Sequence, residues 1–258
     1  MPDKEISNPI NWAVNSFRIT VFPVLRDGNI SLNQEYVSKL WPKNTDAVLK
    51  NTIVSSELGQ ITLEGEYKNK KLLLVAMPFK IDLVVLPKVQ VDVTTASLQT
   101  LGIYDEIIDD LNALAESWIK QDNFPPIQRF AVAPELVSRI KSHDEAYVAI
   151  SQYLPFDLEP STSSDFRYQI NKFVSSNVIT DLKINRVTAW DVLKINLQLS
   201  TMQTTQAPIR YDDLYYCHLT LDINTDLENQ NELNKDKLPL LCRELISYTE
   251  TISKEGMS

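Results

Sequence analysis

The sequence is poor in glycine, cysteine and histidine, and each shortage excludes a class of function. Only 5 of the 258 residues are glycine, and neither GxGxxG nor GxxxxGK[ST] occurs, which removes the commonest nucleotide-binding loops. The 2 cysteines, Cys217 and Cys242, form no CxxC pair and cannot build a disulfide framework. Because there are only 2 histidines, His143 and His218, a His-rich metal site is excluded. We therefore expect no cofactor and no metal.

Long apolar segments are also missing. The longest apolar run extends from Leu72 to Phe79, far too short to span a bilayer. The first residues are polar and contain no apolar signal region. These features predict a cytoplasmic protein with reduced thiols and no membrane association.

The net charge is −9, and the acidic excess is shared by both halves of the chain. Free nucleic acid is an unsuitable partner for such a chain, because phosphate contacts need clustered lysine and arginine. The simplest explanation of the charge is solubility. The alternative is an acidic docking face for a basic partner, for which the candidates on the first long helix are Asp105, Glu106, Asp109 and Asp110.

An internal repeat emerges when the chain is aligned with itself so that Arg18 lies over Arg129. Six further identities follow without a gap: Val21 with Val132, Pro23 with Pro134, Leu25 with Leu136, Ser31 with Ser142, Tyr36 with Tyr147, and Val37 with Val148. In both copies an alternating strand ends at a proline, which cannot donate to a ladder. A capping box then opens a helix at Ser31 and at Ser142.

Further strands and one long amphipathic helix follow in each copy. The predicted strands cover 60–67, 71–77 and 80–86 in the first copy, and 165–173, 181–190, 191–200 and 214–224 in the second. The long helices carry apolar stripes at Ile107, Leu111, Leu114 and Trp118, and at Leu238, Leu241, Leu245, Tyr248 and Ile252. Asp236 is the expected cap of the second long helix, and Gly256 its end.

The predicted fold is therefore an α+β fold of two tandem β-α-β(3-4)-α repeats. Each repeat is expected to form an antiparallel sheet packed on its own long helix. The element order is similar to that of the helix-grip, TATA-binding-protein-like folds and implies a pseudo-two-fold axis. The expected domains are residues 1–123 and 124–258, since Asn123-Phe-Pro-Pro126 reads as a boundary.

No catalytic centre is identifiable. Cys217 and His218 are neighbours in a strand, so their side chains point to opposite faces and cannot pair. His143 belongs to the capping box that begins at Ser142. Asp222 has no second and third acid at a metal-ligating spacing.

A recurring x-Ile-Asn pattern in the predicted strands is the strongest binding signal. Isoleucine would face the core, and its neighbours would line the opposite sheet face. The residues of this candidate binding face are Arg167, Gln169, Asn171, Lys183, Asn185, Arg186, Asp222 and Asn224. Asparagine is disfavoured in strands, so its repetition suggests a polar binding face. The competing interpretation is that these asparagines end strands in turns or bulges.

Three segments resemble a bacterial family of uncharacterised proteins of about this length. They are Phe166-Arg-Tyr-Gln-Ile-Asn171, Ile184-Asn-Arg186 with Trp190, and Leu221-Asp-Ile-Asn-Thr225. These match the YQIN, INR…W and LDINT strand motifs of that family. The chain is also distantly similar to a sporadically distributed conserved hypothetical family. The resemblance implies no known activity, and its patchy occurrence suggests antiviral (phage) defence.

The expected function is that of a non-catalytic binding or adaptor subunit of a bacterial multi-protein complex. Its partner would be a protein, either one with a basic surface or a second copy in a homo-oligomer. One alternative is a small-ligand-binding protein that uses a cavity between sheet and helix. The second alternative is an unrecognised metal-dependent hydrolase or nuclease.

Overall fold

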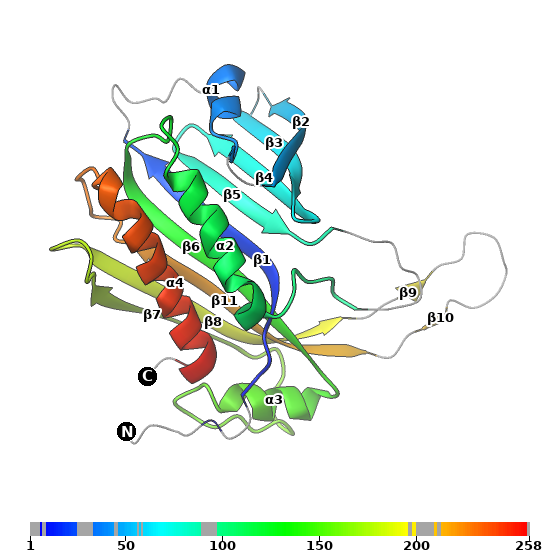
Figure 1. Cartoon of the computed structure of the whole chain (residues 1–258). Coiled ribbons are helices and arrows are strands. Elements are labelled where there is room, and N and C mark those ends of the chain that lie inside the picture. The colour runs from blue at the N-terminus through cyan, green and yellow to red at the C-terminus, as the bar shows by residue number, and fades with distance from the viewer. Residues whose placement is uncertain are drawn as a thin grey trace.

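The chain forms two layers, a large antiparallel sheet and a set of helices on one of its faces (Figure 1). The computed structural model describes residues 6, 9–24, 33–43, 46–55, 57, 59–88, 97–195, 198–199, 209–210 and 213–256. Within them the main sheet has nine strands in the order β2-β3-β4-β5-β1-β6-β11-β8-β7. A separate two-stranded sheet pairs β10 with β9.

The bounds of the elements are as follows. The strands of the first half are β1 (Ala13–Pro23), β2 (Ala47–Ser55), β3 (Gln60–Tyr67), β4 (Lys70–Met77) and β5 (Lys80–Leu86). Those of the second half are β6 (Ile127–Ile140), β7 (Arg167–Ser175), β8 (Lys183–Ile195), β9 (Gln198–Leu199), β10 (Ile209–Arg210) and β11 (Leu214–Thr225). The helices are α1 (Gln34–Lys39), α2 (Tyr104–Ile119), α3 (His143–Ser151) and α4 (Leu238–Glu255), with a 3-10 turn at Lys235–Lys237.

The prediction of two separate helix-packed sheets is wrong. Strands β1 and β6 pair antiparallel at the centre, with Ile19 opposite Val132, and this pairing merges both halves into one sheet. A free strand edge presents unpaired backbone groups, and joining two such edges satisfies them. Arg18 and Arg129, which align with each other in the internal repeat, also lie in different surroundings. Arg18 is exposed, whereas the guanidinium of Arg129 lies 4.2 Å from the centre of the Phe22 ring.

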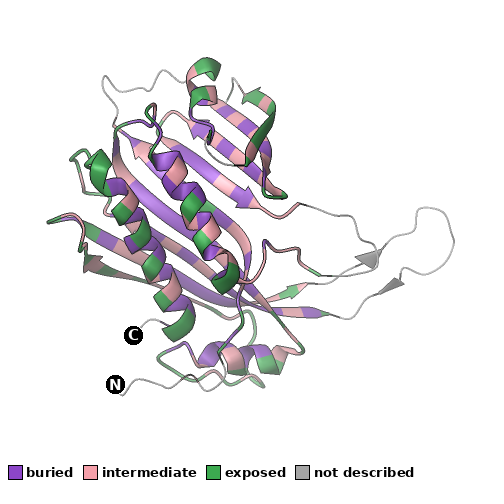
Figure 2. Cartoon of the chain, viewed as in Figure 1, coloured by how far each residue is buried: buried purple, intermediate pink, exposed green. Residues whose placement is uncertain are grey.

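The core lies between the sheet and the helices, as the alternating buried and intermediate residues show (Figure 2). On this side of the sheet β1 buries Phe17, Ile19 and Val21, and β11 buries Cys217, Leu219, Leu221 and Ile223; a smaller buried cluster of Val137, Leu214 and Tyr216 lies on the other side. This period of two is that of a strand with one buried face. We call the face that carries these side chains and the helices the helical face, and the other the bare face.

Several local predictions are confirmed. Strands β3 and β5 have the predicted bounds. The β3–β4 hairpin turns at Lys68 and Asn69, whose φ angles of 43° and 63° are those of a type I′ turn. Ser142 caps α3 by accepting a hydrogen bond from the Glu145 amide. The predicted cap Ser31 lies outside the described residues, and Asn33 caps α1.

Other local predictions are wrong. Strand β6 does not end at Pro134 but continues to Ile140. Pro134 faces Phe17, next to a register shift between Val14 and Ser16, and such irregularities are where a strand tolerates proline. The two strands expected between 181 and 200 are mainly one strand, β8. Asp236 is not the cap of α4, which begins directly after the 3-10 turn.

Gly65 in β3 is a point of close approach, and it gives a first testable prediction. A Cβ atom there would lie 2.1 Å from the Val48 carbonyl oxygen and 2.6 Å from the Trp41 ring. Gly65→Ala should therefore lower the free energy of unfolding by about 1–3 kcal/mol through overpacking. Urea denaturation measures this loss. Thr62→Ala, on the other face of the same strand, is the control and should change the free energy by less than about 0.5 kcal/mol; equal effects of both variants would contradict the prediction.

Candidate functional site

The predicted asparagines form a row across three strands of the bare face. The Asn171 amide donates to Asn185 Oδ1 at 3.4 Å, and the Asn185 amide donates to Asn224 Oδ1 at 3.2 Å. Asn224 in turn donates to Asp222 Oδ1 at 3.0 Å. All four residues lie within β7, β8 and β11 rather than in turns. We call them the polar row; that it binds a partner remains a prediction.

Three more candidates extend this face, and one does not belong to it. Arg167 donates to Gln169 at 3.2 Å, and the Lys183 ammonium lies 6.0 Å from the centre of the exposed Phe173 ring. Arg186 instead lies on the helical face, because it follows Asn185 directly in β8. Its guanidinium is 5.7 Å from the centre of the Tyr248 ring of α4. The asparagine of the remaining x-Ile-Asn match, Asn196, lies outside the described residues.

At the centre of the bare face, one histidine joins two carboxylates. His218 Nδ1 lies 2.8 Å from Asp191 Oδ1, and His218 Nε2 lies 2.9 Å from Glu135 Oε1. The strand register explains this contact, because Asp191 of β8 and Val137 of β6 flank His218 directly. Ser16 of β1 donates to the second Glu135 oxygen at 3.1 Å. We call His218, Asp191 and Glu135 the histidine bridge.

Opposing effects set the charge of this bridge. Burial alone would lower the pKa of His218, but the hydrogen bonds to Asp191 and Glu135 outweigh it and raise that pKa to about 9. The hydrogen bond from His218 lowers the pKa of Glu135 to about 2, although burial opposes the shift. At neutral pH the imidazolium therefore donates from both ring nitrogens. Since neither nitrogen has a free lone pair, His218 in this state is not a general base.

The histidine bridge was not found from the sequence. Opposite faces for Cys217 and His218 were predicted, and that is what the structure shows. The partners of His218 are far from it in the chain, at separations of 27 and 83 residues. Only the order of β6, β11 and β8 in the sheet brings them together. One signal in the sequence could have indicated the bridge. A histidine occurs in a strand whose other face is predicted to be apolar and to lie in the core.

The acidic face of α2 is partly neutralised by lysines. Asp110 pairs with Lys68 at 2.8 Å, and Asp105 pairs with Lys254 at 3.2 Å. Glu106 and Asp109 are exposed on the same helix. An acidic docking face for a basic partner remains a prediction. Two of its four carboxylates are ion-paired, so it offers less negative charge than the sequence indicated.

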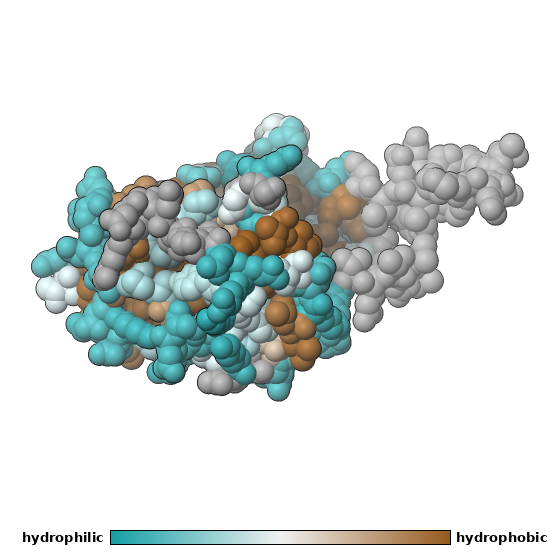
Figure 3. Space-filling model, turned by 90° about the horizontal axis from the view of Figure 1, so that it is seen from above, coloured by the Kyte–Doolittle hydropathy of each residue, from teal (hydrophilic) through white to brown (hydrophobic). Residues whose placement is uncertain are grey.

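The edge strand β2 exposes an unusual amount of apolar surface. Its exposed large side chains are Val48 (59%), Leu49 (39%), Ile53 (51%) and Val54 (56%). Seen from above, with the β2 end of the sheet toward the viewer, hydrophobic atoms gather near the middle of the molecule (Figure 3). The one charged residue of β2, Lys50, forms an ion pair with Glu66 of β3. Natural edge strands usually carry charges or proline against unwanted pairing, so an apolar edge calls for an explanation.

Both thiols are packed into the core. Cys217 contacts the Ala146 carbonyl oxygen at 3.6 Å, and burial raises its pKa to about 12. Burial also raises the pKa of Cys242. Thiolates are the nucleophilic form of cysteine, so neither thiol is activated at neutral pH.

The described part of the chain forms neither a candidate metal site nor a candidate membrane-spanning helix. No group of three or more His, Cys, Asp or Glu side chains is placed there to hold a metal ion. No helix among the described residues is long and apolar enough to cross a bilayer.

No family model and no curated protein matches the chain. The resemblance to an uncharacterised bacterial family therefore stays a prediction.

Proposed function

We propose that the chain is a non-catalytic binding protein that takes up an extended segment of a partner protein at the outer edge of β2. The observation that supports this is the exposed apolar edge, where four of nine strand residues are large, hydrophobic and exposed. The adaptor role expected from the sequence is the same role in more general terms.

The backbone of β2 determines what kind of partner fits. Strand β2 is the first strand of the sheet order and pairs on one side only, with β3, among the described strands. Its outer N–H and C=O groups suit an extended strand, which would add to the sheet by main-chain hydrogen bonds. Side chains alternate between the two faces, so Ile53 and Val54 would each contact an apolar side chain of the partner.

The bulge in β2 favours another protein over a second copy. The register shifts between Leu49 and Asn51. In an antiparallel pair of identical strands centred on Ile53, pairing would cover only Asn51 to Ser55, because β2 ends at Ser55 and the bulged part of each strand would lie beyond that end. Val48 and Leu49 would then gain no cross-strand neighbour. A different sequence can carry a matching extra residue, so it can pair along the whole strand.

Affinity purification with edge variants tests this proposal. Tagged full-length chain is used to capture proteins from its own cells, and the captured protein is then purified and recombined with the chain. Ile53→Lys/Val54→Lys should weaken the reconstituted complex at least about tenfold, since buried charges at a strand edge oppose pairing. Phe173→Lys/Leu227→Lys, which changes two exposed apolar side chains away from β2, is the matched control and should bind like the unchanged chain.

Two results would contradict the proposal. One is a reconstituted complex that binds the edge variant and the unchanged chain equally well. The other is sedimentation of the purified chain as a homo-oligomer that the edge variant dissociates, because the occupant of β2 would then be a second copy.

A further inference from the structure

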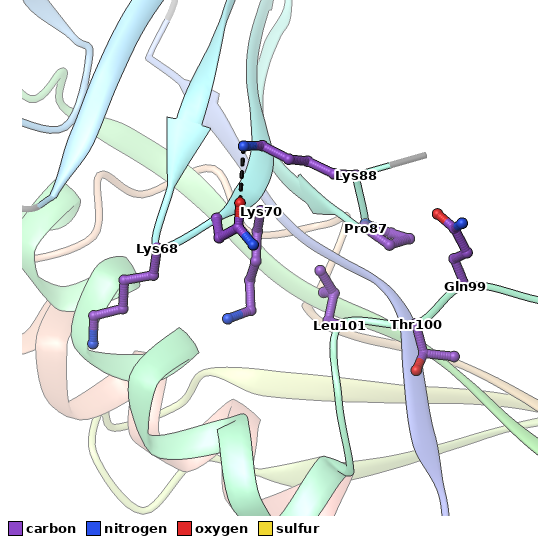
Figure 4. A pocket seen from close by; sticks show the side chains of 8 residues that line it. Lys68, Lys70, Pro87, Lys88, Gln99, Thr100 and Leu101 are labelled. Carbon is purple, nitrogen blue, oxygen red and sulfur yellow. Dashed lines mark hydrogen bonds between the residues drawn. The ribbon is translucent and has the colours of Figure 1, made fainter. Parts of the chain in front are cut away.

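A pocket lined by lysines lies at the tip of the β3–β4 hairpin (Figure 4). Its volume is about 380 Å³, within the range of sites for small molecules. Three separate segments line it: the hairpin, the two residues that follow β5, and the residues that lead into α2. The lining residues are Lys68, Asn69, Lys70, Pro87, Lys88, Gln99, Thr100 and Leu101.

The charge of this lining has one sign. It contains three lysines and no acidic residue, in a chain whose net charge is −9. The nearby acids lie outside the lining, where Asp110 pairs with Lys68 and Glu66 pairs with both Lys88 and Lys50. Together with Lys70, the region has four lysines and only two carboxylates, so it keeps an excess of positive charge.

Local structure holds these lysines in place. The type I′ turn fixes Lys68 and Asn69 at the hairpin tip. The Lys88 ammonium donates to Asn69 Oδ1 at 3.0 Å, which ties the end of β5 to the hairpin (Figure 4). Lys70 begins β4 and has no ion-pair partner among the described residues. Its charge is therefore available to a ligand.

We propose that this pocket binds a small phosphorylated molecule. The lysines would attract the phosphate as point charges. The Thr100 hydroxyl can donate to a phosphate oxygen, and the apolar side chains of Pro87 and Leu101 would contact the rest of the molecule. This site is separate from the edge of β2 and does not depend on the partner proposed there.

Isothermal titration calorimetry with inorganic pyrophosphate tests the site. The full chain should bind one pyrophosphate saturably with a Kd below about 1 mM. Lys70→Gln should weaken this binding about fivefold, and Lys68→Gln/Lys70→Gln/Lys88→Gln should abolish it, because each removed charge weakens attraction to the anion. The matched control is Lys183→Gln/Lys194→Gln/Lys254→Gln, which removes the same charge from lysines outside the pocket and should bind as the unchanged chain does.

Three results would overturn this assignment. Absence of saturable heat overturns it, as does equal weakening by the pocket and control variants, which would show a general charge effect. Equal binding of citrate overturns the phosphate class, since a tricarboxylate would then satisfy the lysines as well. Circular dichroism melting of each variant shows whether it is folded, and all six lysines are at least partly exposed, so the native fold is expected.

Discussion

Replacing His218 with glutamine is expected to lower the free energy of unfolding at pH 7 by about 3 kcal/mol. The substitution removes the cation that Asp191 and Glu135 share and leaves a buried carboxylate, Asp191, without its partner. Breaking a buried ion pair from one side is costly because the remaining charge stays desolvated. Urea denaturation at pH 7 measures the loss. The control is His143→Gln, which removes the other histidine of the chain, and it should change the free energy by less than about 0.5 kcal/mol.

The same residue should make stability depend on pH. The pKa of His218 is about 9 in the folded chain, above the usual value of about 6.5. Because the folded state holds this proton more tightly, the stabilisation is complete below pH 6.5 and is lost as pH rises through 9. The unchanged chain should therefore lose about 2–3 kcal/mol between pH 7 and pH 10, and His218→Gln should lack this slope. Equal slopes in the two proteins would show that His218 is not held as an imidazolium.

The parts of the fold that were predictable are those set by local sequence. Strand β3 alternates strictly between apolar and polar or small residues, and the turn that follows it, Lys68-Asn69, adopts positive φ angles. The two long helices have apolar stripes with helical spacing, and Leu111, Leu114 and Leu245 are fully buried. In each case neighbouring residues carry the whole signal.

The predictions that failed concern contacts between strands that are far apart in the chain. Pairing of β1 with β6 brings together residues more than 100 positions apart in the chain, and no periodicity encodes it. Strand β2 was not predicted, because an edge strand with both faces exposed lacks the alternation that marks a half-buried strand. The polar row was predictable in outline, since Asn185 and Asn224 flank buried isoleucines, but the histidine bridge needed the strand register.

Trp118→Ala is expected to lower the free energy of unfolding by about 3–5 kcal/mol. Trp118 of α2 is fully buried, and its ring packs edge-on against Phe124 at a centroid distance of 5.3 Å. Its indole N–H donates to the Leu40 carbonyl oxygen at 2.8 Å. Truncation would leave a large cavity and an unsatisfied buried carbonyl, and both are destabilising. Thermal and urea denaturation measure the loss.

This substitution should also loosen β2, the strand proposed to take up a partner segment, although Trp118 lies in the core. The segment held at Leu40 continues into Trp41, whose ring covers Gly65 and whose indole N–H donates to the Ala47 carbonyl oxygen at the start of β2. Loosening this segment would let β2 separate from β3 before the rest of the sheet opens. Hydrogen exchange should therefore quicken at the β2 amides in Trp118→Ala more than at those of β11. Trp118→Phe keeps most of the buried ring and loses the hydrogen bond, so a loss of about 1–2 kcal/mol is expected. If exchange quickened equally in β2 and β11, the anchoring of β2 through Leu40 and Trp41 would be disproved.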